Sequence, residues 1–182
     1  VVVRDPGEIL DLDPDLVIFI ERLGKTGDGG YYNMKGEDIS RCTEPLDDMA
    51  GLAIERGIPV LAIGDGGNEA GMACLMPGMG EILTGFNHRL STVPSTVALP
   101  VDVSNWGAYA LACLLSCRRG QWLGHGPEEE RRMIEAMVSA GAVDGVTGRR
   151  ELSVDGLPVE EHAAVVKKLR EIYESVIGNR RT

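Results

Sequence analysis

Aromatic residues, long apolar runs and excess basic charge are all scarce in this sequence. Aromatic side chains make up 4% of the 182 residues, so the core has to be built from aliphatic side chains. No apolar run approaches the roughly 20 residues that cross a bilayer, and no signal-peptide pattern opens the chain. The net charge of −10 comes from 28 acidic and 18 basic residues and repels phosphate backbones and anionic lipids. The sequence therefore predicts a protein that binds neither nucleic acid nor membranes.

Paired cysteine and histidine motifs are also missing. The four cysteines lie far apart without a C-x-x-C pair, and no H-E-x-x-H zinc motif occurs. Cys113 and Cys117 have the i, i+4 spacing that would let two thiols on one helix share a metal. In a reducing compartment, such cysteines are more often small buried apolar residues. The cysteine pattern therefore predicts a cytoplasmic location.

Short apolar segments alternate with helical patterns along the chain. Apolar runs predict strands at residues 15–20, 58–63 and 96–101, the first two of them buried on both faces. Helices are expected at residues 44–56, 68–75, 106–117, 127–141 and 159–177. Thr43 suits the N-cap of the first helix and Gly57 its C′ position, and the last helix places Val159, Ala163 and Val166 on one apolar face. A small hairpin is expected within residues 143–157, which contain two Asp-Gly turns. This order predicts an α/β fold with a mainly parallel sheet and helices on both faces, a Rossmann-like three-layer arrangement, followed by the small C-terminal hairpin and helix. Since no repeat or long linker divides the chain, one domain is expected over residues 1–182.

The polar loop after the second expected strand is the strongest candidate for chemistry. Residues 64–69 read Gly-Asp-Gly-Gly-Asn-Glu, and glycines allow positive φ and close approach of backbone N–H groups to a ligand. The helix expected from residue 68 would point its positive end at the same place. Asp65 and Glu69 suit acid–base catalysis or the binding of Mg²⁺ or Mn²⁺, the one cofactor that the sequence leaves open. The alternative is a plain glycine turn in which Asp65 or Asn68 caps the helix.

Two further polar loops follow expected strands: the first loop, residues 21–36, and a short loop at residues 102–105. In open α/β sheets, ligands bind beyond the carboxyl ends of the strands, so all three loops are expected at one edge. Arg22 and Lys35 can hold a substrate carboxylate, unless the first loop is simply a solvated surface loop. The side chains of these two loops that we expect to contact a substrate are Glu21, Arg22, Tyr32, Asn33, Lys35, Ser104 and Asn105. Ser104 and Asn105 also suit the N-cap of the following helix.

Four ordered motifs cover most of the chain. They are Ile20-Glu21-Arg22 with residues 29–34, residues 63–69 with Gly71-Met72, residues 103–107 with 109–111, and residues 143–148 with 154–158. Together they resemble the D-glutamate cyclase family. The resemblance implies a lyase that converts D-glutamate to 5-oxo-D-proline and water. It also implies a further α/β segment before Val1 in the full domain of the family.

The implied cyclisation requires a base, an acid, donors for a tetrahedral oxyanion and a clamp for the α-carboxylate. Asp65 and Glu69 are the expected base and acid, acting directly or through a bound metal. The expected oxyanion donors are the Gly66 N–H, the Gly67 N–H and the Asn68 amide, and the expected clamp is Arg22 or Lys35. The expected partner is therefore a small anionic amino acid, and the sequence leaves a homo-oligomer open.

Two other functions are compatible with the glycine-rich loop. In haloacid-dehalogenase-type phosphatases, a similar loop holds magnesium, but these enzymes also require an Asp-x-Asp motif directly after a strand. Here Asp11 and Asp13 precede the first clear strand instead. The second alternative is a non-catalytic module whose loop binds a small acid. Phosphate release would identify the first alternative, and binding without turnover would identify the second.

Overall fold

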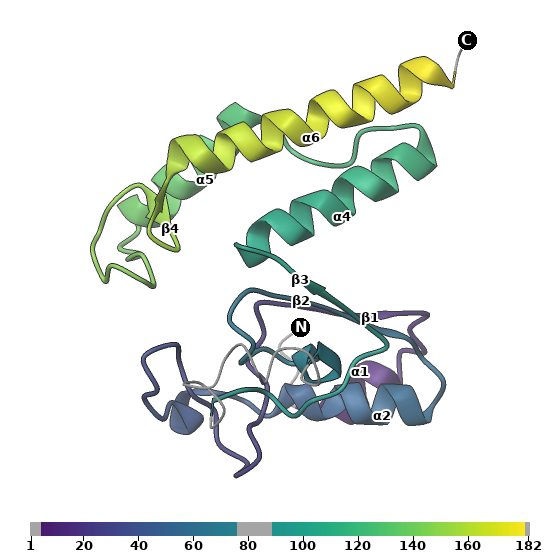
Figure 1. Cartoon of the computed structure of the whole chain (residues 1–182), viewed down its shortest axis with the longest axis vertical. Coiled ribbons are helices and arrows are strands. Elements are labelled where there is room, and N and C mark those ends of the chain that lie inside the picture. Colours follow the sequence, from purple (N-terminus) through teal and green to yellow (C-terminus); the bar gives the residue numbers. More distant parts are fainter. Residues whose placement is uncertain (1–4, 76–88, 181–182) are drawn as a thin grey trace. The chain divides into compact units, whose positions relative to one another are not determined.

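The structure, a computed structural model, describes residues 5–75 and 89–180. The chain divides into two compact units, Val1–Gly107 and Ala108–Thr182 (Figure 1). The assignment of a single domain to residues 1–182 stays a prediction. Within the described ranges, no helix combines the length and the apolar character that a membrane span needs.

The first unit is built on a three-stranded parallel sheet. Its elements are the helix α1 (Pro6–Leu10), β1 (Val17–Ile20), the 3₁₀ helices η1 (Ser40–Cys42) and η2 (Leu46–Asp48), α2 (Met49–Glu55), β2 (Val60–Gly64), the 3₁₀ helix η3 (Met72–Leu75) and β3 (Val97–Pro100). The strand order is β1-β2-β3, and both neighbouring pairs are parallel. The three predicted strands are therefore confirmed.

Helices contact both faces of this sheet. Val17 and Phe19 of β1 belong to a buried cluster with residues of α1 and α2, which lie on the same side of the sheet (Figure 1). On the other face, the first turn of α4 (Ser104–Arg119) approaches β2 so closely that a Cβ on Gly107 would lie 2.4 Å from the Ile63 side chain. The α/β prediction is confirmed. Ile18 and Ile20 are 40% and 44% exposed, so the prediction that β1 is buried on both faces was wrong for these two residues.

The helix predicted at residues 68–75 is the main error of the sequence analysis in this unit. Residues 68–70 instead run beside the segment after β1, where the Gly24 N–H donates to the Asn68 carbonyl and the Ala70 N–H donates to the Arg22 carbonyl. Gly71 then has φ +94°, which is incompatible with a right-handed helix. Only the short η3 helix follows, so the structure does not support the helix N-terminus that we expected beside the glycine-rich loop.

The helix predicted from residue 44 begins later, with η2 and then α2 at Met49. Pro45 has ψ +49°, which is outside the helical region. Asp47 is fully buried and accepts hydrogen bonds from the Lys25 N–H and the Tyr31 hydroxyl. Hydrogen bonds from the first polar loop, and not an N-cap, therefore fix the conformation of this segment. The predicted end is confirmed, since Gly57 has φ +75° directly after the last turn.

The second unit contains most of α4, two further helices and a hairpin. Its elements after α4 are α5 (Pro127–Ser139), β4 (Ser153–Val154), β5 (Leu157–Pro158) and α6 (Val159–Asn179). The antiparallel β4–β5 pair turns at Asp155 and Gly156, which both have positive φ, as a tight hairpin requires. The predicted apolar face of α6 is buried at Val159, Ala163 and Val166, so the C-terminal hairpin and helix are confirmed.

A buried carboxylate joins α4 to α5. Glu130 is 2% exposed and accepts hydrogen bonds from the Tyr109 hydroxyl at 2.8 Å and the His125 ring at 2.7 Å. Both carboxylate oxygens are thereby satisfied, which offsets the cost of removing the group from water. This cluster is explained by packing within the second unit.

Asp144 organises the loop before the hairpin. Its carboxylate accepts hydrogen bonds from the Val146 and Thr147 N–H groups at 2.8 Å, the Ser153 hydroxyl at 2.7 Å and the Gly156 N–H at 2.9 Å. Burial alone would raise the pKa of Asp144, but these hydrogen bonds outweigh it and lower the pKa to about 2. The ionised form therefore stabilises the folded loop.

We expect the variant Asp144→Asn to be less stable at neutral pH by about 2 kcal/mol, because the amide nitrogen cannot accept two of these hydrogen bonds. Since the pKa is lower in the folded state than in the unfolded state, the contribution of the ionised carboxylate is present above about pH 4 and is lost as the pH falls towards 2. The stability difference from wild type should therefore shrink over that range in denaturation curves. The exposed Glu135→Gln on α5 is the control, and a pH-independent difference for Asp144→Asn would contradict the prediction.

Candidate active site

The loops that follow the three strands meet at the carboxyl edge of the sheet. Glu21 directly follows β1, and its N–H donates to the Ile63 carbonyl of β2 at 3.1 Å. Asp65 directly follows β2 and accepts a hydrogen bond from the Ser104 N–H at 2.8 Å. Ser104 begins α4, shortly after β3. The edge that carries ligands in open α/β sheets is therefore lined here by residues from all three predicted loops.

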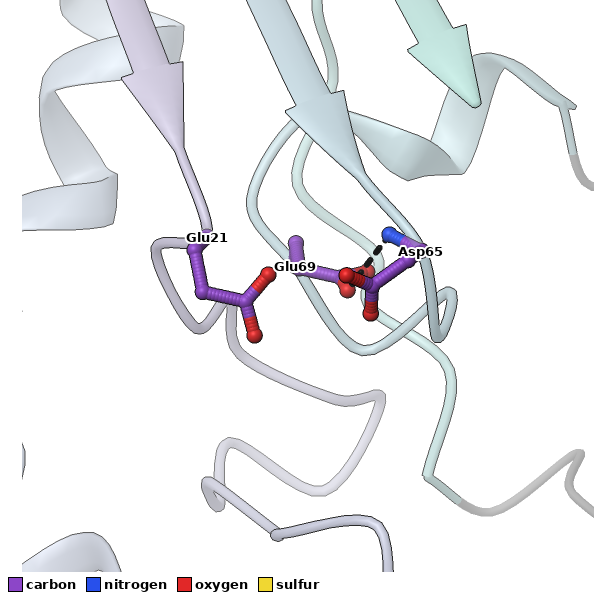
Figure 2. A group of neighbouring side chains, drawn as sticks. All are labelled: Glu21, Asp65 and Glu69. Atoms are coloured by element: carbon purple, nitrogen blue, oxygen red, sulfur yellow. Dashed lines mark hydrogen bonds between the residues drawn. The ribbon is translucent and has the colours of Figure 1, made fainter. Parts of the chain in front are cut away.

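Three carboxylates gather at this edge. One carboxylate oxygen from each of Glu21, Asp65 and Glu69 lies within 4.8 Å of the other two. Figure 2 shows the three side chains converging from the ends of β1 and β2 and from the glycine-rich loop. Glu21 and Asp65 are exposed, whereas Glu69 is only 2% exposed. The cluster is thus open to solvent at Glu21 and Asp65 and closed at Glu69.

Glu69 fixes the shape of the glycine-rich loop. Its Oε1 accepts hydrogen bonds from the Asp65 N–H at 2.9 Å and the Gly66 N–H at 2.7 Å. Burial raises the pKa of the Glu69 carboxyl above its ordinary value, hydrogen bonds from the Gly66 and Asp65 N–H groups oppose the rise, and the neighbouring Asp65 charge adds to it. The Gly66 N–H is thereby engaged, so its predicted contact with an oxyanion requires Glu69 to release it.

The glycines of this loop are needed for two different reasons. Gly67 has positive φ, as expected. Gly64 instead leaves room for Glu69, because a Cβ at this position would lie 2.8 Å from Glu69 Oε2. At Gly66, a Cβ would lie 2.5 Å from the Met34 sulfur. Close packing against Glu69 at Gly64 and against Met34 at Gly66, as well as backbone conformation at Gly67, therefore accounts for the composition of the loop.

Glu21 has a strained backbone. Its φ of +52° lies in the left-handed region, which side chains other than Gly, Asn and Asp seldom adopt. Such strain persists only where surrounding contacts hold it, and it is concentrated at functional sites. Glu21 is one of the substrate contacts predicted from the sequence, and the structure places it in the carboxylate cluster.

Gly24 is a site-forming residue that the sequence analysis missed. It lies beside the isolated antiparallel bridge between Leu23 and Glu69, which joins the first loop to the glycine-rich loop. A Cβ on Gly24 would lie 2.2 Å from the Ser91 hydroxyl and 2.8 Å from the Ala70 backbone. The available signal was a glycine in the loop that follows β1, but the contact itself depends on residues distant in sequence.

The other predicted residues of the first loop and the glycine-rich loop form hydrogen bonds within and between these two loops. Asn68 is buried, and its amide donates to the Tyr32 carbonyl at 2.9 Å, so it joins the two loops. The Asn33 amide donates to Glu37 at 2.6 Å, and its side-chain oxygen accepts from the Lys35 N–H at 3.0 Å. Among the described residues, no hydrogen bond joins the side chain of Asn33 or Lys35 to the carboxylate cluster. Their substrate contacts stay predictions.

Unpartnered polar atoms are concentrated on predicted site residues. Within residues 5–75 and 89–180, three buried side-chain atoms have no hydrogen-bond partner: Arg22 Nε, Glu69 Oε2 and Ser104 Oγ. Buried polar groups are normally satisfied, because an unpaired one costs free energy. Arg22 also donates from Nη2 to the Glu44 carbonyl. The unpartnered atoms of Glu69 and Ser104 therefore belong to residues at the carboxyl edge of the sheet, whereas the Arg22 side chain is engaged with the segment before η2.

The phosphatase alternative is not favoured by the position of its required motif. Asp11 caps the C-terminus of α1, and Asp13 lies in the turn that leads into β1. Both precede the strand, at the end opposite to the carboxylate cluster, so neither can serve as a nucleophile beside Asp65.

Comparison with known proteins gives the family. The protein-family model described as "D-glutamate cyclase-like, C-terminal" matches residues 4–170. The chain is 33% identical over 184 aligned residues to a human protein named "D-glutamate cyclase, mitochondrial". That alignment covers 87% of this chain and 30% of the relative, so the chain spans less than a third of the relative's length. Because the relative is named as mitochondrial, the cytoplasmic location stays a prediction. The extent of the family match shows that the chain belongs to the D-glutamate cyclase family.

Proposed function

We propose that the site at the carboxyl edge of the sheet cyclises D-glutamate to 5-oxo-D-proline with loss of water. The observation that carries the proposal is the convergence of Glu21, Asp65 and Glu69 at an edge that also holds orphaned buried polar atoms. Family membership and the name of the human relative support the choice of reaction and substrate. The expected substrate is thus a small acidic amino acid.

The reaction requires two protons to move between atoms of the substrate. The α-nitrogen of zwitterionic glutamate forms a bond to the δ-carbon of the side-chain carboxylate and loses two protons as it becomes a lactam nitrogen. The bond from that carbon to one oxygen breaks, and the oxygen takes up two protons and leaves as water. A group that accepts protons from nitrogen and returns them to oxygen would speed both steps.

Asp65 is the residue best placed to move these protons. Its carboxylate is exposed, and the Ser104 N–H holds one of its oxygens, which orients the other. Glu69 is buried and holds the Asp65 and Gly66 N–H groups, so it positions the loop and is the second candidate for the proton transfer. Substrate contacts by Arg22, Lys35, Gly67 and Asn105 complete the proposal.

The proposal is tested by incubating the purified chain with D-glutamate or L-glutamate and measuring 5-oxoproline by chiral chromatography. We expect 5-oxo-D-proline from the D-isomer at a rate above that of buffer alone, and no enzymatic product from the L-isomer. Product from neither isomer would overturn the proposed reaction. In that case, binding of D-glutamate detected by calorimetry would identify the non-catalytic binding module instead.

A further inference from the structure

The carboxylate cluster is exceptional within the described part of the chain. Among residues 5–75 and 89–180, it is the one place where three His, Cys, Asp or Glu side chains bring ligand atoms close enough to share a cation. Its members come from two loops, because Glu21 follows β1 while Asp65 and Glu69 belong to the loop after β2. The parallel pairing of β1 with β2 aligns Ile20 with Ile63 and so sets the two strand ends side by side.

Two members of the cluster, Asp65 and Glu69, have no basic side chain within ion-pair distance among the described residues. Like charges at this distance repel one another, and the repulsion is strongest for a group removed from water. A positive charge between the three carboxylates would remove that repulsion.

The second observation is the unpartnered oxygen of Glu69. The residue is only 2% exposed, and Oε1 takes both backbone hydrogen bonds while Oε2 takes none. The carboxylate that carries this oxygen lies between Glu21 and Asp65 (Figure 2). A buried carboxylate oxygen without a donor, placed among further carboxylates, is the arrangement that a cation would satisfy.

We propose that Glu21, Asp65 and Glu69 together bind one hard divalent cation of the Mg²⁺, Mn²⁺ and Ca²⁺ class. All three donors are carboxylate oxygens, the ligands that these cations prefer over softer metals. Ligands on opposite sides of one ion are separated by about 4.2 Å for Mg²⁺ and about 4.6–5.2 Å for Ca²⁺, and the oxygens here lie within 4.8 Å. The exposed side of Glu21 and Asp65 leaves positions for water or a substrate carboxylate.

The cation site is tested by titrating the metal-free chain with Mn²⁺ and measuring free Mn²⁺ by electron paramagnetic resonance. We expect one saturable site per chain from which excess Mg²⁺ or Ca²⁺ displaces Mn²⁺. The variant Glu21→Gln should weaken Mn²⁺ binding by about tenfold or more, because it removes one charged ligand. Glu21 is exposed, so this change leaves the packing around the buried Glu69 intact.

A matched control and a second readout separate binding from folding. Asp15→Asn removes an exposed carboxylate at the opposite end of β1 and should bind Mn²⁺ as the wild type does. The melting temperature of the wild type should rise with Mg²⁺ relative to EDTA, and this rise should vanish in Glu21→Gln. Absence of a saturable Mn²⁺ site, or equal affinity in the wild type and Glu21→Gln, overturns the proposal. Because both readouts measure binding, the cation site stands or falls independently of 5-oxoproline formation.

Discussion

Replacement of Asp65 by Asn is expected to lower kcat/KM for 5-oxo-D-proline formation by about 100-fold or more. The amide keeps the size of the side chain and can still accept the hydrogen bond from the Ser104 N–H, but it can neither take nor return a proton at pH 7. Loss of a positioned acid–base group typically costs a factor of about 10²–10⁴. Initial rates over a range of D-glutamate concentrations, with circular dichroism to verify folding, measure the effect.

The control for this experiment is Asp15→Asn, which makes the same chemical change at an exposed residue before β1. It should leave both kcat and KM at their wild-type values. Unchanged turnover in a folded Asp65→Asn variant would rule out Asp65 as the proton-transfer group. A higher KM with unchanged kcat would instead give Asp65 a role in substrate binding alone.

Local sequence patterns predicted the elements of the fold that depend on local chemistry. Continuous apolar runs located β1 and β2, and Gly57 marked the end of α2 because a glycine readily adopts positive φ there. The Asp155-Gly156 pair located the hairpin for the same reason. At these places, the conformation is decided by the residues themselves and their immediate neighbours.

The errors arose where distant residues decide the conformation. The helix predicted at residues 68–75 is replaced over its first half by pairing with residues 22–24, which no periodicity reveals. The start of α2 is shifted because Asp47 bonds to Tyr31 in the first loop. In both cases, tertiary hydrogen bonds compete with local helix propensity and prevail.

The candidate site was predictable in its residue types and in its place at one edge of the sheet, and not in the distances between its side chains. A carboxylate-rich glycine loop after a strand pointed to Asp65 and Glu69. The third carboxylate is different, since Glu21 reaches the cluster only through the register that sets Ile20 beside Ile63. The close packing of Glu69 against Gly64 likewise depends on side-chain placement in three dimensions.

The variant Gly71→Ala is expected to lower the free energy of unfolding by about 3–4 kcal/mol. Gly71 has φ +94°, which costs a residue with a Cβ about 1–2 kcal/mol. The new Cβ would also lie 2.2 Å from the Cβ of Ala62, in the buried centre of β2. Since the Ala62 Cβ is fixed to the strand backbone, relief requires the loop or the sheet to move, and overpacking of this kind costs about 1–3 kcal/mol. The loss is large because the whole stability of an ordinary domain is about 5–15 kcal/mol.

Gly57→Ala separates the two causes of this loss. Gly57 also has positive φ, at +75°, but among the described residues no atom lies within 4 Å of the position that its Cβ would take. It should therefore show the backbone cost alone, about 1–2 kcal/mol, in urea denaturation measured by circular dichroism. The difference between the two variants, about 2 kcal/mol, measures the clash with β2. Equal losses in the two variants would show that the loop after Glu69 moves away from the sheet at no cost, and the predicted clash with β2 would be wrong.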